Sequence, residues 1–248
     1  MWIFFKKWLS SVPLLKNLNG QLIFQKEKLE FSGLNTEEVF TKIYTNKRWG
    51  VSSENPDSFS SGFGSHGISA DQYVLFLNDF IQRHCIKVIT DIGCGDFAIG
   101  SKIVRANPFL HYNGCDVVKD VIDLNLKQYG SPFVKFYHKN CSTDVLPEAD
   151  LLTIRQVLQH LSNNEIAKIL AKAEKYKYVI ITEHLLKEGT EKSYNKDKHP
   201  GPHIRLIQDS GVYINKPPFS LSCTEVLRCR EDIYNKEAYI VTFLISNV

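Results

Sequence analysis

A short apolar run that ends in two closely spaced glycines constrains the fold of this chain more than any other feature. The run from Lys87 to Ile92 is rich in β-branched residues, which is typical of a strand buried on both faces of a sheet. Gly93 and Gly95 follow it and permit a sharp turn against which a ligand could lie. Apolar residues at helical spacing over 98–105 then predict a helix, whose first N–H groups would be free beside the glycines. We therefore expect a strand, a turn and a helix that together hold a ligand.

Strand and helix patterns alternate along most of the chain. The predicted parallel strands are 87–92, 111–117, 133–138, 150–154 and 178–182, and the helices between them are 98–106, 118–129 and 163–175. Asn163 is the expected cap of the last of these helices. Two alternating segments at 219–228 and 238–246 predict an antiparallel pair of strands near the C-terminus. The pattern predicts an α/β fold with a doubly wound, Rossmann-like, mostly parallel seven-stranded sheet, an antiparallel C-terminal strand pair and N-terminal helical additions.

One catalytic domain with an N-terminal addition accounts for the length of the chain. With 248 residues, the chain can form one full α/β domain but not two large ones. We expect the core at 85–248, with an arm, helices and a lid loop at 1–84 packed on it. Capping-box patterns at 35–38 and 69–72 predict two helices in this addition. The aromatic residues of the loop 48–66 are typical of a lid over a site.

The composition is that of an ordinary folded protein. Charged residues make up 23% of the chain and the net charge is +3, but the lysines are scattered, so we expect no nucleic acid partner. The six cysteines form no CxxC pair, which indicates reduced thiols in a cytoplasmic protein. No apolar run reaches the roughly 18 residues that a membrane-spanning helix needs.

The N-terminal residues 1–16 combine aromatic and aliphatic residues with lysines. A secretory signal would place its positive charges first and its apolar core after them, and this segment has the opposite order. One interpretation is an arm that packs on its own domain or on a partner subunit. The alternative is an amphipathic helix that lies peripherally on the inner face of the membrane.

Two acidic residues beside the glycine turn indicate the kind of ligand. Asp116 ends the second predicted strand about 20 residues after Gly95, where a carboxylate can accept both hydroxyls of a ribose. The spacing Gly93-x-Gly95-x-x-Ala98 also fits a dinucleotide fingerprint. However, Asp91 lies just before the glycines, where its charge would repel a pyrophosphate and attract an ammonium group. We therefore favour a nucleoside cofactor that carries an amino acid over NAD(P).

The motif around this turn resembles that of class I S-adenosylmethionine-dependent methyltransferases, and the resemblance extends over about 85–248. The first motif of that family reads acidic-x-Gly-x-Gly-x-Gly and is matched here by Asp91, Gly93 and Gly95. Phe97 stands in place of the third glycine. The resemblance implies that the cofactor is S-adenosyl-L-methionine.

The same resemblance implies roles for residues that follow the other predicted strands. Asp116 looks like the carboxylate that holds the ribose, and Asn140 stands where the family often has an aspartate that contacts the adenine. An amide can make that contact equally well. Val117, Cys141 and Arg155 complete the cofactor contacts that we expect from this likeness.

A narrower resemblance concerns the methyl acceptor. The segment 150–161 is similar to the segment that follows the fourth strand in this family. Motifs at 49–50, 61–65, 197–205 and 211–219 resemble those of small-molecule and surface-polysaccharide methyltransferases. This likeness implies O-methylation of a small polar acceptor such as a sugar, a sugar phosphate or a glycan precursor. The expected acceptor-binding residues are Trp49, Ser65, His203, Arg205 and Tyr213.

An alcohol acceptor also needs a base. His160 is the first candidate, because imidazole titrates near neutral pH and the residue follows the fourth strand; His184, after the fifth strand, is the rival. Arg205, in the expected substrate loop 183–218, could bind a phosphate or carboxylate with two N–H groups. No candidate group has a recognised metal-ligand spacing, so no metal is expected. An NAD(P)-dependent oxidoreductase and a non-catalytic adaptor that keeps the cofactor fold remain alternatives.

Overall fold

The computed structural model of the chain describes residues 13–51 and 59–248, with the backbone alone for 13–19. The contacts expected for residues 1–16 therefore lie outside the described side chains. Of the helices in the described part of the chain, none is long and apolar enough to cross a lipid bilayer. The expected boundary between 1–84 and 85–248 stays a prediction.

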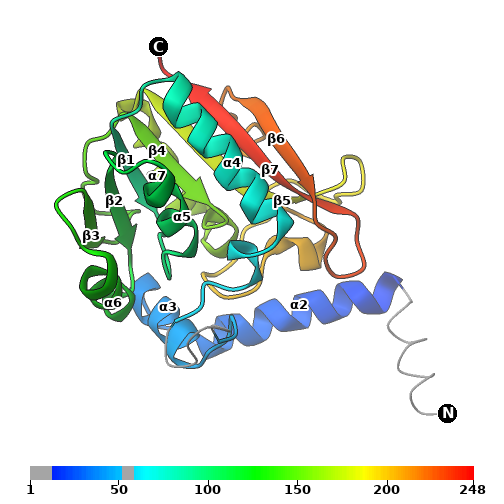
Figure 1. The fold of residues 1–248 in the computed structure, drawn as a ribbon. Helices are drawn as coiled ribbons and strands as arrows, with labels where there is room; N and C mark the ends of the chain where they lie inside the picture. The colour runs from blue at the N-terminus through cyan, green and yellow to red at the C-terminus, as the bar shows by residue number, and fades with distance from the viewer. Residues whose placement is uncertain (1–12, 52–58) are drawn as a thin grey trace.

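A seven-stranded sheet forms the centre of the molecule (Figure 1). Its strand order is β3-β2-β1-β4-β5-β7-β6, in which β7 is antiparallel to both β5 and β6 and the other neighbours are parallel. The strands are β1 Val88–Ile92, β2 His111–Asp116, β3 Val134–His138, β4 Leu151–Arg155, β5 Tyr178–Leu186, β6 Thr224–Arg230 and β7 Ala238–Ser246. This confirms the predicted α/β fold with its antiparallel C-terminal pair.

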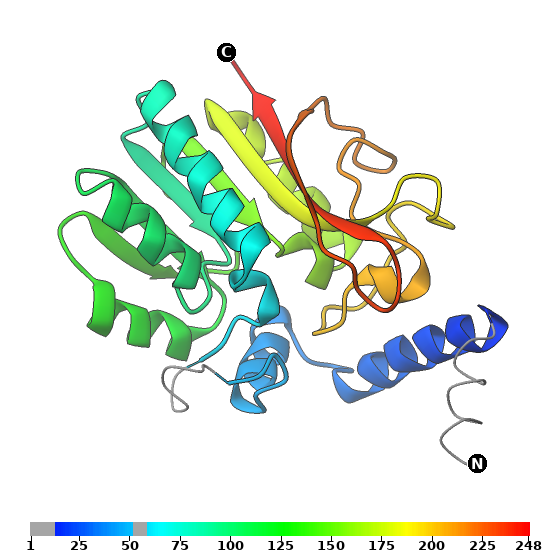
Figure 2. The same ribbon diagram turned by 45° about the vertical axis from the view of Figure 1, so that its right-hand side comes forward.

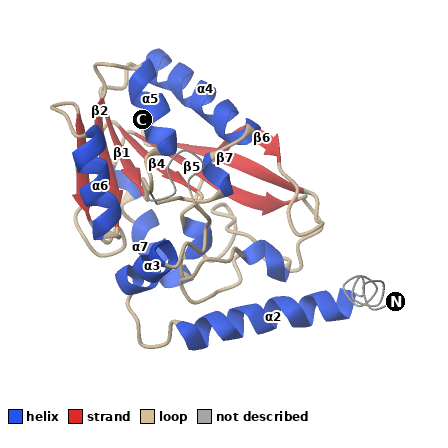
Figure 3. Ribbon diagram, turned by 60° about the horizontal axis from the view of Figure 1, so that its bottom comes forward, coloured by secondary structure: helices blue, strands red, loops and turns tan. Residues whose placement is uncertain are grey.

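Helices cover both faces of the sheet (Figure 3). The α-helices are α2 Pro13–Glu30, α3 Thr36–Thr45, α4 Ile68–Arg83, α5 Ala98–Ala106, α6 Lys119–Tyr129 and α7 Asn163–Leu170, and the short 3₁₀ turns are η1 Phe63–Ser65, η2 Leu158–His160, η3 Ala173–Lys175 and η4 Arg205–Gln208. One apolar cluster joins α4 and α5 to the sheet, and another joins α3 and α7 to it. The sheet therefore separates two cores.

Alternation along the buried strands divides the sheet residues between these cores. In β4, Leu151 packs into the cluster that contains α4, while its neighbour Leu152 packs into the cluster that contains α3. In β5, Ile180 and Ile181 divide in the same way. Because both faces are buried, successive residues in these strands are apolar, as at Leu151–Leu152 and Val179–Ile181, which is why the sequences read as continuous runs.

The strands near the C-terminus differ from their predicted limits. β5 was expected to end at Thr182 but continues to Leu186, because it pairs with β7 over its whole length. β6 begins at Thr224 rather than at Phe219. The N–H groups of Phe219 and Ser220 instead bond to the carbonyl of Lys216, so this part of the predicted strand forms a turn.

The structure confirms the predicted cap of α3 and corrects the predicted caps of α7 and α4. Asn35 and Glu38 form the predicted capping box of α3. The cap of α7 is Ser162, which pairs with Glu165, and not Asn163 as predicted. The predicted capping pattern at 69–72 is also wrong, because α4 begins at Ile68 after a glycine and has no side-chain cap.

Helix α2 is absent from the sequence prediction. Its contact with the core depends on Gly20, where a Cβ would lie 2.7 Å from the carbonyl oxygen of Ile207. Glu27 is buried and accepts a 3.1 Å hydrogen bond from the backbone N–H of His203. Because α2 docks through a glycine and a buried charge, and Leu22 and Leu29 are exposed, it has no simple apolar stripe for a periodicity argument to find.

The N-terminal helices and the loop that follows β5 meet at the carboxyl edge of the sheet. Figures 1 and 2 show α2 and α3 at this edge, beside the loop that follows β5. Open parallel sheets bind ligands outside the carboxyl ends of their strands. The fold therefore brings the N-terminal helices and the expected substrate loop to the place where a ligand site is expected.

Candidate active site

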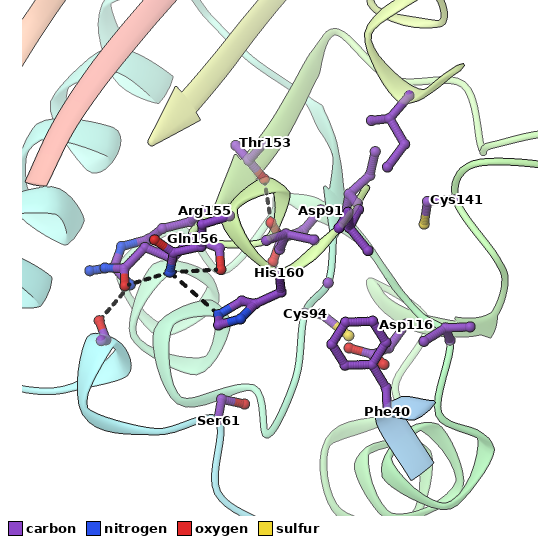
Figure 4. A pocket seen from close by; sticks show the side chains of 18 of the residues that line it. Phe40, Ser61, Asp91, Cys94, Asp116, Cys141, Thr153, Arg155, Gln156 and His160 are labelled. Atoms are coloured by element: carbon purple, nitrogen blue, oxygen red, sulfur yellow. Dashed lines mark hydrogen bonds between the residues drawn. The ribbon is translucent and has the colours of Figure 1, made fainter. Parts of the chain in front are cut away.

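A pocket opens at the carboxyl ends of β1, β2 and β4, with about 1180 Å³ of empty space including the part open to solvent. Figure 4 shows Asp116 and Cys141 toward one side of the pocket and Arg155 and Gln156 toward the other, with Asp91 between them. The pocket brings together ten of the residues predicted from the sequence, namely Trp49, Ser65, Asp91, Gly93, Asp116, Val117, Asn140, Cys141, Arg155 and His160.

The two glycines of the turn make room for other segments of the chain. Both have positive φ, +69° at Gly93 and +54° at Gly95, a conformation that glycine adopts without strain. A Cβ on Gly93 would lie 2.4 Å from a methyl of Val157, and one on Gly95 would lie 2.1 Å from the Oγ of Ser61. Protein atoms thus fill the space where a Cβ would lie, while the backbone of Gly93 still lines the pocket as expected for a ligand contact. The residues between and after the glycines, Cys94 and Asp96, line the pocket.

The loop at 59–66 is bound to the glycine turn. Ser61 donates its N–H to Asp96 at 2.9 Å, and its hydroxyl accepts the N–H of Asp96 at 2.8 Å. The carbonyl of Gly64 accepts a 2.6 Å bond from Arg155. Ser61 and Gly64 belong to the sequence motif at 61–65, but their hydrogen-bond partners are decided by the tertiary structure.

Asp91 lies at the centre of the pocket. Its carboxylate accepts hydrogen bonds from the hydroxyls of Thr153, at 2.6 Å, and Tyr112. Burial raises the pKa of Asp91 to about 6, although these bonds and the charge of Arg155 oppose the rise. Each carboxylate oxygen keeps a further acceptor site for a ligand.

Arg155 supplies donors to the same pocket. Its guanidinium is buried and lies 5.1 Å from the ring centroid of Tyr73, and burial lowers its pKa. One nitrogen bonds to the carbonyl of Gly64, while Nε and Nη2 have no partner among the described residues. Unpaired buried donors are costly, so the N–H groups of these two nitrogens indicate a ligand with acceptor oxygens.

Asp116 and Asn140 lie at the other side of the pocket. Asp116 accepts the N–H groups of Gly95, at 3.1 Å, and Val118, at 3.0 Å, and burial raises its pKa. The amide oxygen of Asn140 accepts two bonds from Ser142, at 3.0 and 2.7 Å. Asn140 thus stabilises its own turn through its amide oxygen, the atom that would accept a hydrogen bond from an adenine amino group.

His160 is held with one ring nitrogen available. Its Nδ1 lies 3.1 Å from the carbonyl oxygen of Gly201, which can only accept, so Nδ1 carries the proton and Nε2 carries the lone pair. The ring lies 5.1 Å from that of Trp49. Burial and then the charge of Lys198 lower the pKa of His160 to about 3. The imidazole is therefore neutral throughout the physiological pH range.

Two buried charged side chains hold the backbone segment that carries His160. Glu183 accepts the N–H groups of Leu158 and Gln159 at 3.0 and 3.1 Å. Arg205 donates to the carbonyl oxygens of Leu158, Gln159 and Leu161 at 2.7 to 3.2 Å. Burial raises the pKa of Glu183, and the hydrogen bonds from the backbone together with the charge of Arg205 oppose this rise and favour the carboxylate. We call these two side chains the Glu183/Arg205 clamp.

The clamp corrects the expected role of Arg205. Its side chain is 1% exposed, does not line the pocket and has its donors engaged by the backbone, so it cannot bind a phosphate. A signal for the clamp did exist, because Glu183 stands in an apolar strand where a carboxylate must find partners.

The remaining predicted residues also lie outside the pocket lining. His184 bonds through Nε2 to the carbonyl of Glu231 at 2.7 Å, and burial lowers its pKa. His203 pairs with Glu27 of α2. Tyr213 is buried in the apolar core that contains α3. The structure therefore does not place His184 as a base, or His203 and Tyr213 as acceptor contacts, in this pocket.

Comparison with known proteins identifies the class to which this fold and pocket belong. A family model for the O-methyltransferase domain matches residues 25–211, and the chain belongs to this family. It is a class I S-adenosylmethionine-dependent methyltransferase, with S-adenosylmethionine as its cofactor. This favours the methyltransferase interpretation over the oxidoreductase alternative. A search of curated protein sequences returned no match.

Solved structures show the same fold at low sequence identity. Magnesium protoporphyrin IX methyltransferase from Synechocystis PCC 6803 with bound SAM has a TM-score of 0.54 and 13% identity, covering 87% of this chain and 99% of that one. N-methyltransferase NodS from Bradyrhizobium japonicum WM9, in complex with S-adenosyl-L-homocysteine, has a TM-score of 0.54 and 10% identity, covering 82% and 98%.

The clamp gives a stability prediction. Arg205→Lys keeps the charge but replaces donors on three nitrogens by the donors of a single nitrogen, which cannot reach all the oxygens that Arg205 binds. We therefore expect it to lower the free energy of unfolding by about 2–4 kcal/mol. Urea denaturation followed by circular dichroism measures this loss. The control is Arg83→Lys, whose exposed ion pair with Asp79 should change stability by less than about 0.5 kcal/mol. Equal effects of the two substitutions would contradict the clamp.

Proposed function

We propose that this protein transfers a methyl group to an oxygen of a small polar acceptor, such as a sugar or a glycan precursor. The observation that carries the proposal is the hydrogen bond from His160 Nδ1 to the carbonyl of Gly201, which leaves Nε2 as a proton acceptor in the pocket. The family description, an O-methyltransferase domain, supports the same choice of atom. A sugar phosphate is less well supported, because Arg205 is not available to bind the phosphate.

The donor and acceptor groups of the pocket fit the cofactor. Asp91 carries the charge that an ammonium group requires, and Arg155 has two unpaired N–H groups for a carboxylate. Together they match the amino-acid end of S-adenosylmethionine. Asp116, on the other side of the pocket, has acceptor sites left for ribose hydroxyls.

The residues near His160 would then act on the acceptor. When bound, S-adenosylmethionine supplies a methyl group on a positively charged sulfur, which becomes neutral when the methyl group leaves. His160 Nε2 accepts a hydrogen bond from the acceptor hydroxyl and directs an oxygen lone pair toward that methyl group. As the new carbon–oxygen bond forms, the hydroxyl proton becomes strongly acidic, so even an imidazole of low pKa can take it.

We also propose a cytoplasmic setting, with residues 1–16 as a contact to a subunit or to the inner membrane face. The order of charges and apolar residues in that segment supports this proposal. A small molecule or a glycan is the proposed partner, and no nucleic acid is expected.

Cofactor binding should depend on the ionisation of Asp91. Its pKa is raised to about 6, so the carboxylate that pairs with an ammonium group is lost as the pH falls through 6. We expect the dissociation constant for S-adenosylmethionine to rise about tenfold between pH 7 and pH 5, measured by isothermal titration calorimetry. Asp91→Asn should bind weakly at both pH values. An affinity of the natural protein that does not change with pH would contradict this role.

His160 should matter for turnover and not for cofactor binding. Once an acceptor is in hand, His160→Ala should lower kcat by about 100-fold or more, while the affinity for S-adenosylhomocysteine stays within about twofold. His111→Ala, at an exposed position that begins β2, is the control and should leave both unchanged. Full turnover of His160→Ala would show that this histidine is not the base.

The pH dependence of kcat distinguishes His160 from an ordinary histidine base. Because its pKa is lowered to about 3, the imidazole stays neutral when the pH falls through 6.5. With saturating cofactor, we expect kcat to show no loss centred near pH 6.5. A fall in kcat centred near pH 6.5 that is seen in the natural protein and is absent from His160→Gln would indicate that His160 titrates normally.

A further inference from the structure

Two glutamines beside His160 end in buried polar atoms that lack partners. Among the described residues, neither Nε2 of Gln156 nor Oε1 of Gln159 has a hydrogen-bond partner. Both side chains line the pocket, and Figure 4 shows Gln156 beside Arg155, away from Asp116. The backbone of Gln156 also has a positive φ of +56°, which is uncommon for a residue with a side chain. Unpaired atoms and backbone strain at the same place indicate a function.

The hydrogen-bond network determines which atom of each amide is unpaired. The Nε2 of Gln159 lies 3.3 Å from the carbonyl oxygen of Gln156, 3.4 Å from its Oε1 and 3.4 Å from Nε2 of His160. All three neighbours are acceptors, so the nitrogen of Gln159 must face them and its oxygen must face away. The two hydrogens of this nitrogen serve the two oxygens of Gln156, which leaves the lone pair of His160 Nε2 for a ligand. The pocket therefore has one unpaired donor, on Gln156, and one unpaired acceptor, on Gln159.

We propose that Gln156, Gln159 and His160 form an acceptor subsite for an uncharged vicinal diol, such as two neighbouring hydroxyls of a sugar. This proposal rests on the proposed O-methyl transfer. His160 Nε2 accepts the proton of the hydroxyl that becomes methylated. Gln159 Oε1 accepts a hydrogen bond from the neighbouring hydroxyl, and Gln156 Nε2 donates one to an oxygen of the pair.

The close spacing of these groups is the reason for a vicinal pair. All three side chains come from one short segment, and Nε2 of Gln159 lies 3.4 Å from both Oε1 of Gln156 and Nε2 of His160. The unpaired atoms belong to these same amide groups, so an acceptor that satisfies them together with His160 must present its oxygens close to one another. Hydroxyls on adjacent carbons do so, whereas a single isolated hydroxyl would leave an amide atom unpaired.

The charges around the subsite favour an uncharged acceptor. Of the lysines and arginines in the described pocket lining, Lys139 follows β3 and bonds through its backbone to Asp116, on the cofactor side. Arg155 serves the carboxylate of the cofactor in the proposed function. Arg205 is enclosed in the clamp. No cation is thus left to neutralise a phosphate beside the reacting oxygen.

Each reaction at this subsite transfers one methyl group to one hydroxyl oxygen. The acceptor oxygen forms a bond to the methyl carbon, the sulfur–carbon bond breaks with its electron pair left on sulfur, and the hydroxyl proton moves to His160 Nε2. The resulting ether has no proton to donate to His160. The product is therefore a monomethyl ether with a free hydroxyl on the adjacent carbon.

The position of the methyl group in the product tests the proposal. The full chain is incubated with S-adenosylmethionine carrying a ¹³C-labelled methyl group and an extract of the cells that contain its gene, and the labelled product is analysed by NMR. We expect a methyl ether whose neighbouring carbon bears a free hydroxyl. Methylation of a nitrogen, a carboxylate or an isolated hydroxyl would overturn the subsite. Complete absence of label transfer would overturn the proposed function as well.

Substitutions of Gln156 and Gln159 test whether these two side chains bind the acceptor. With the acceptor so found, Gln156→Leu and Gln159→Leu should each raise KM at least about tenfold, while S-adenosylhomocysteine binding by calorimetry stays within about twofold. Gln156→Glu, which keeps the size and removes the donor, should behave as Gln156→Leu does. The control is Gln82→Leu, an exposed position near the end of α4.

An acceptor analogue separates recognition from a general effect on structure. An analogue without the neighbouring hydroxyl should react with the natural protein at a low kcat/KM, and replacing Gln159 should lower that value little further. If removing the hydroxyl lowered kcat/KM by the same factor in the natural protein and in the Gln159 variant, the role of Gln159 would be overturned. A loss of cofactor binding in the Gln156 variants would overturn the assignment of Gln156 to the acceptor.

Discussion

The backbone at 158–161 is held from both sides by one acidic and one basic side chain, and the arrangement of the active site depends on this clamp. Glu183, within β5, accepts two of its N–H groups, and Arg205, from the loop after that strand, donates to three of its carbonyls. Burying two charges is costly unless both are fully hydrogen-bonded, and the backbone supplies those bonds here. The result is a rigid segment that presents Gln159 and His160 to the pocket.

The same loop orients His160 and connects it to the N-terminal helix. The carbonyl oxygen of Gly201 accepts a hydrogen bond from Nδ1 of His160, while Lys198 donates to the carbonyls of Gly201 and His203. Glu27 of α2 lies 4.0 Å from Lys198, whose burial lowers its pKa to about 7. The protonation of the catalytic candidate thus depends on contacts between segments that are distant in the sequence, and α2 is part of the support of the site.

Sequence reasoning named the residues that line the proposed cofactor side of the pocket and missed most of those on the proposed acceptor side. Asp91 and Asp116 were identifiable because each is among the last two residues of a strand of recognisable pattern, and parallel strands bring their carboxyl ends to one edge. Gln156 had no such signal, since an amide after a strand is ordinary until its partners are known to be missing. Arg205 was misassigned because an arginine in a loop has the same sequence signature whether it is exposed or enclosed.

The sequence by itself determined the strands, most of the helices, the parallel sheet and the glycine turn, because these follow from periodicity, β-branched runs and backbone freedom within a few neighbouring residues. It also determined the class of cofactor, through Asp91 and the glycines. The tertiary structure decided that protein atoms of Ser61 and Val157 fill the space beside those glycines. It also decided which polar atoms are paired and which remain for a ligand, because hydrogen-bond partners and burial depend on residues that are far apart in the chain.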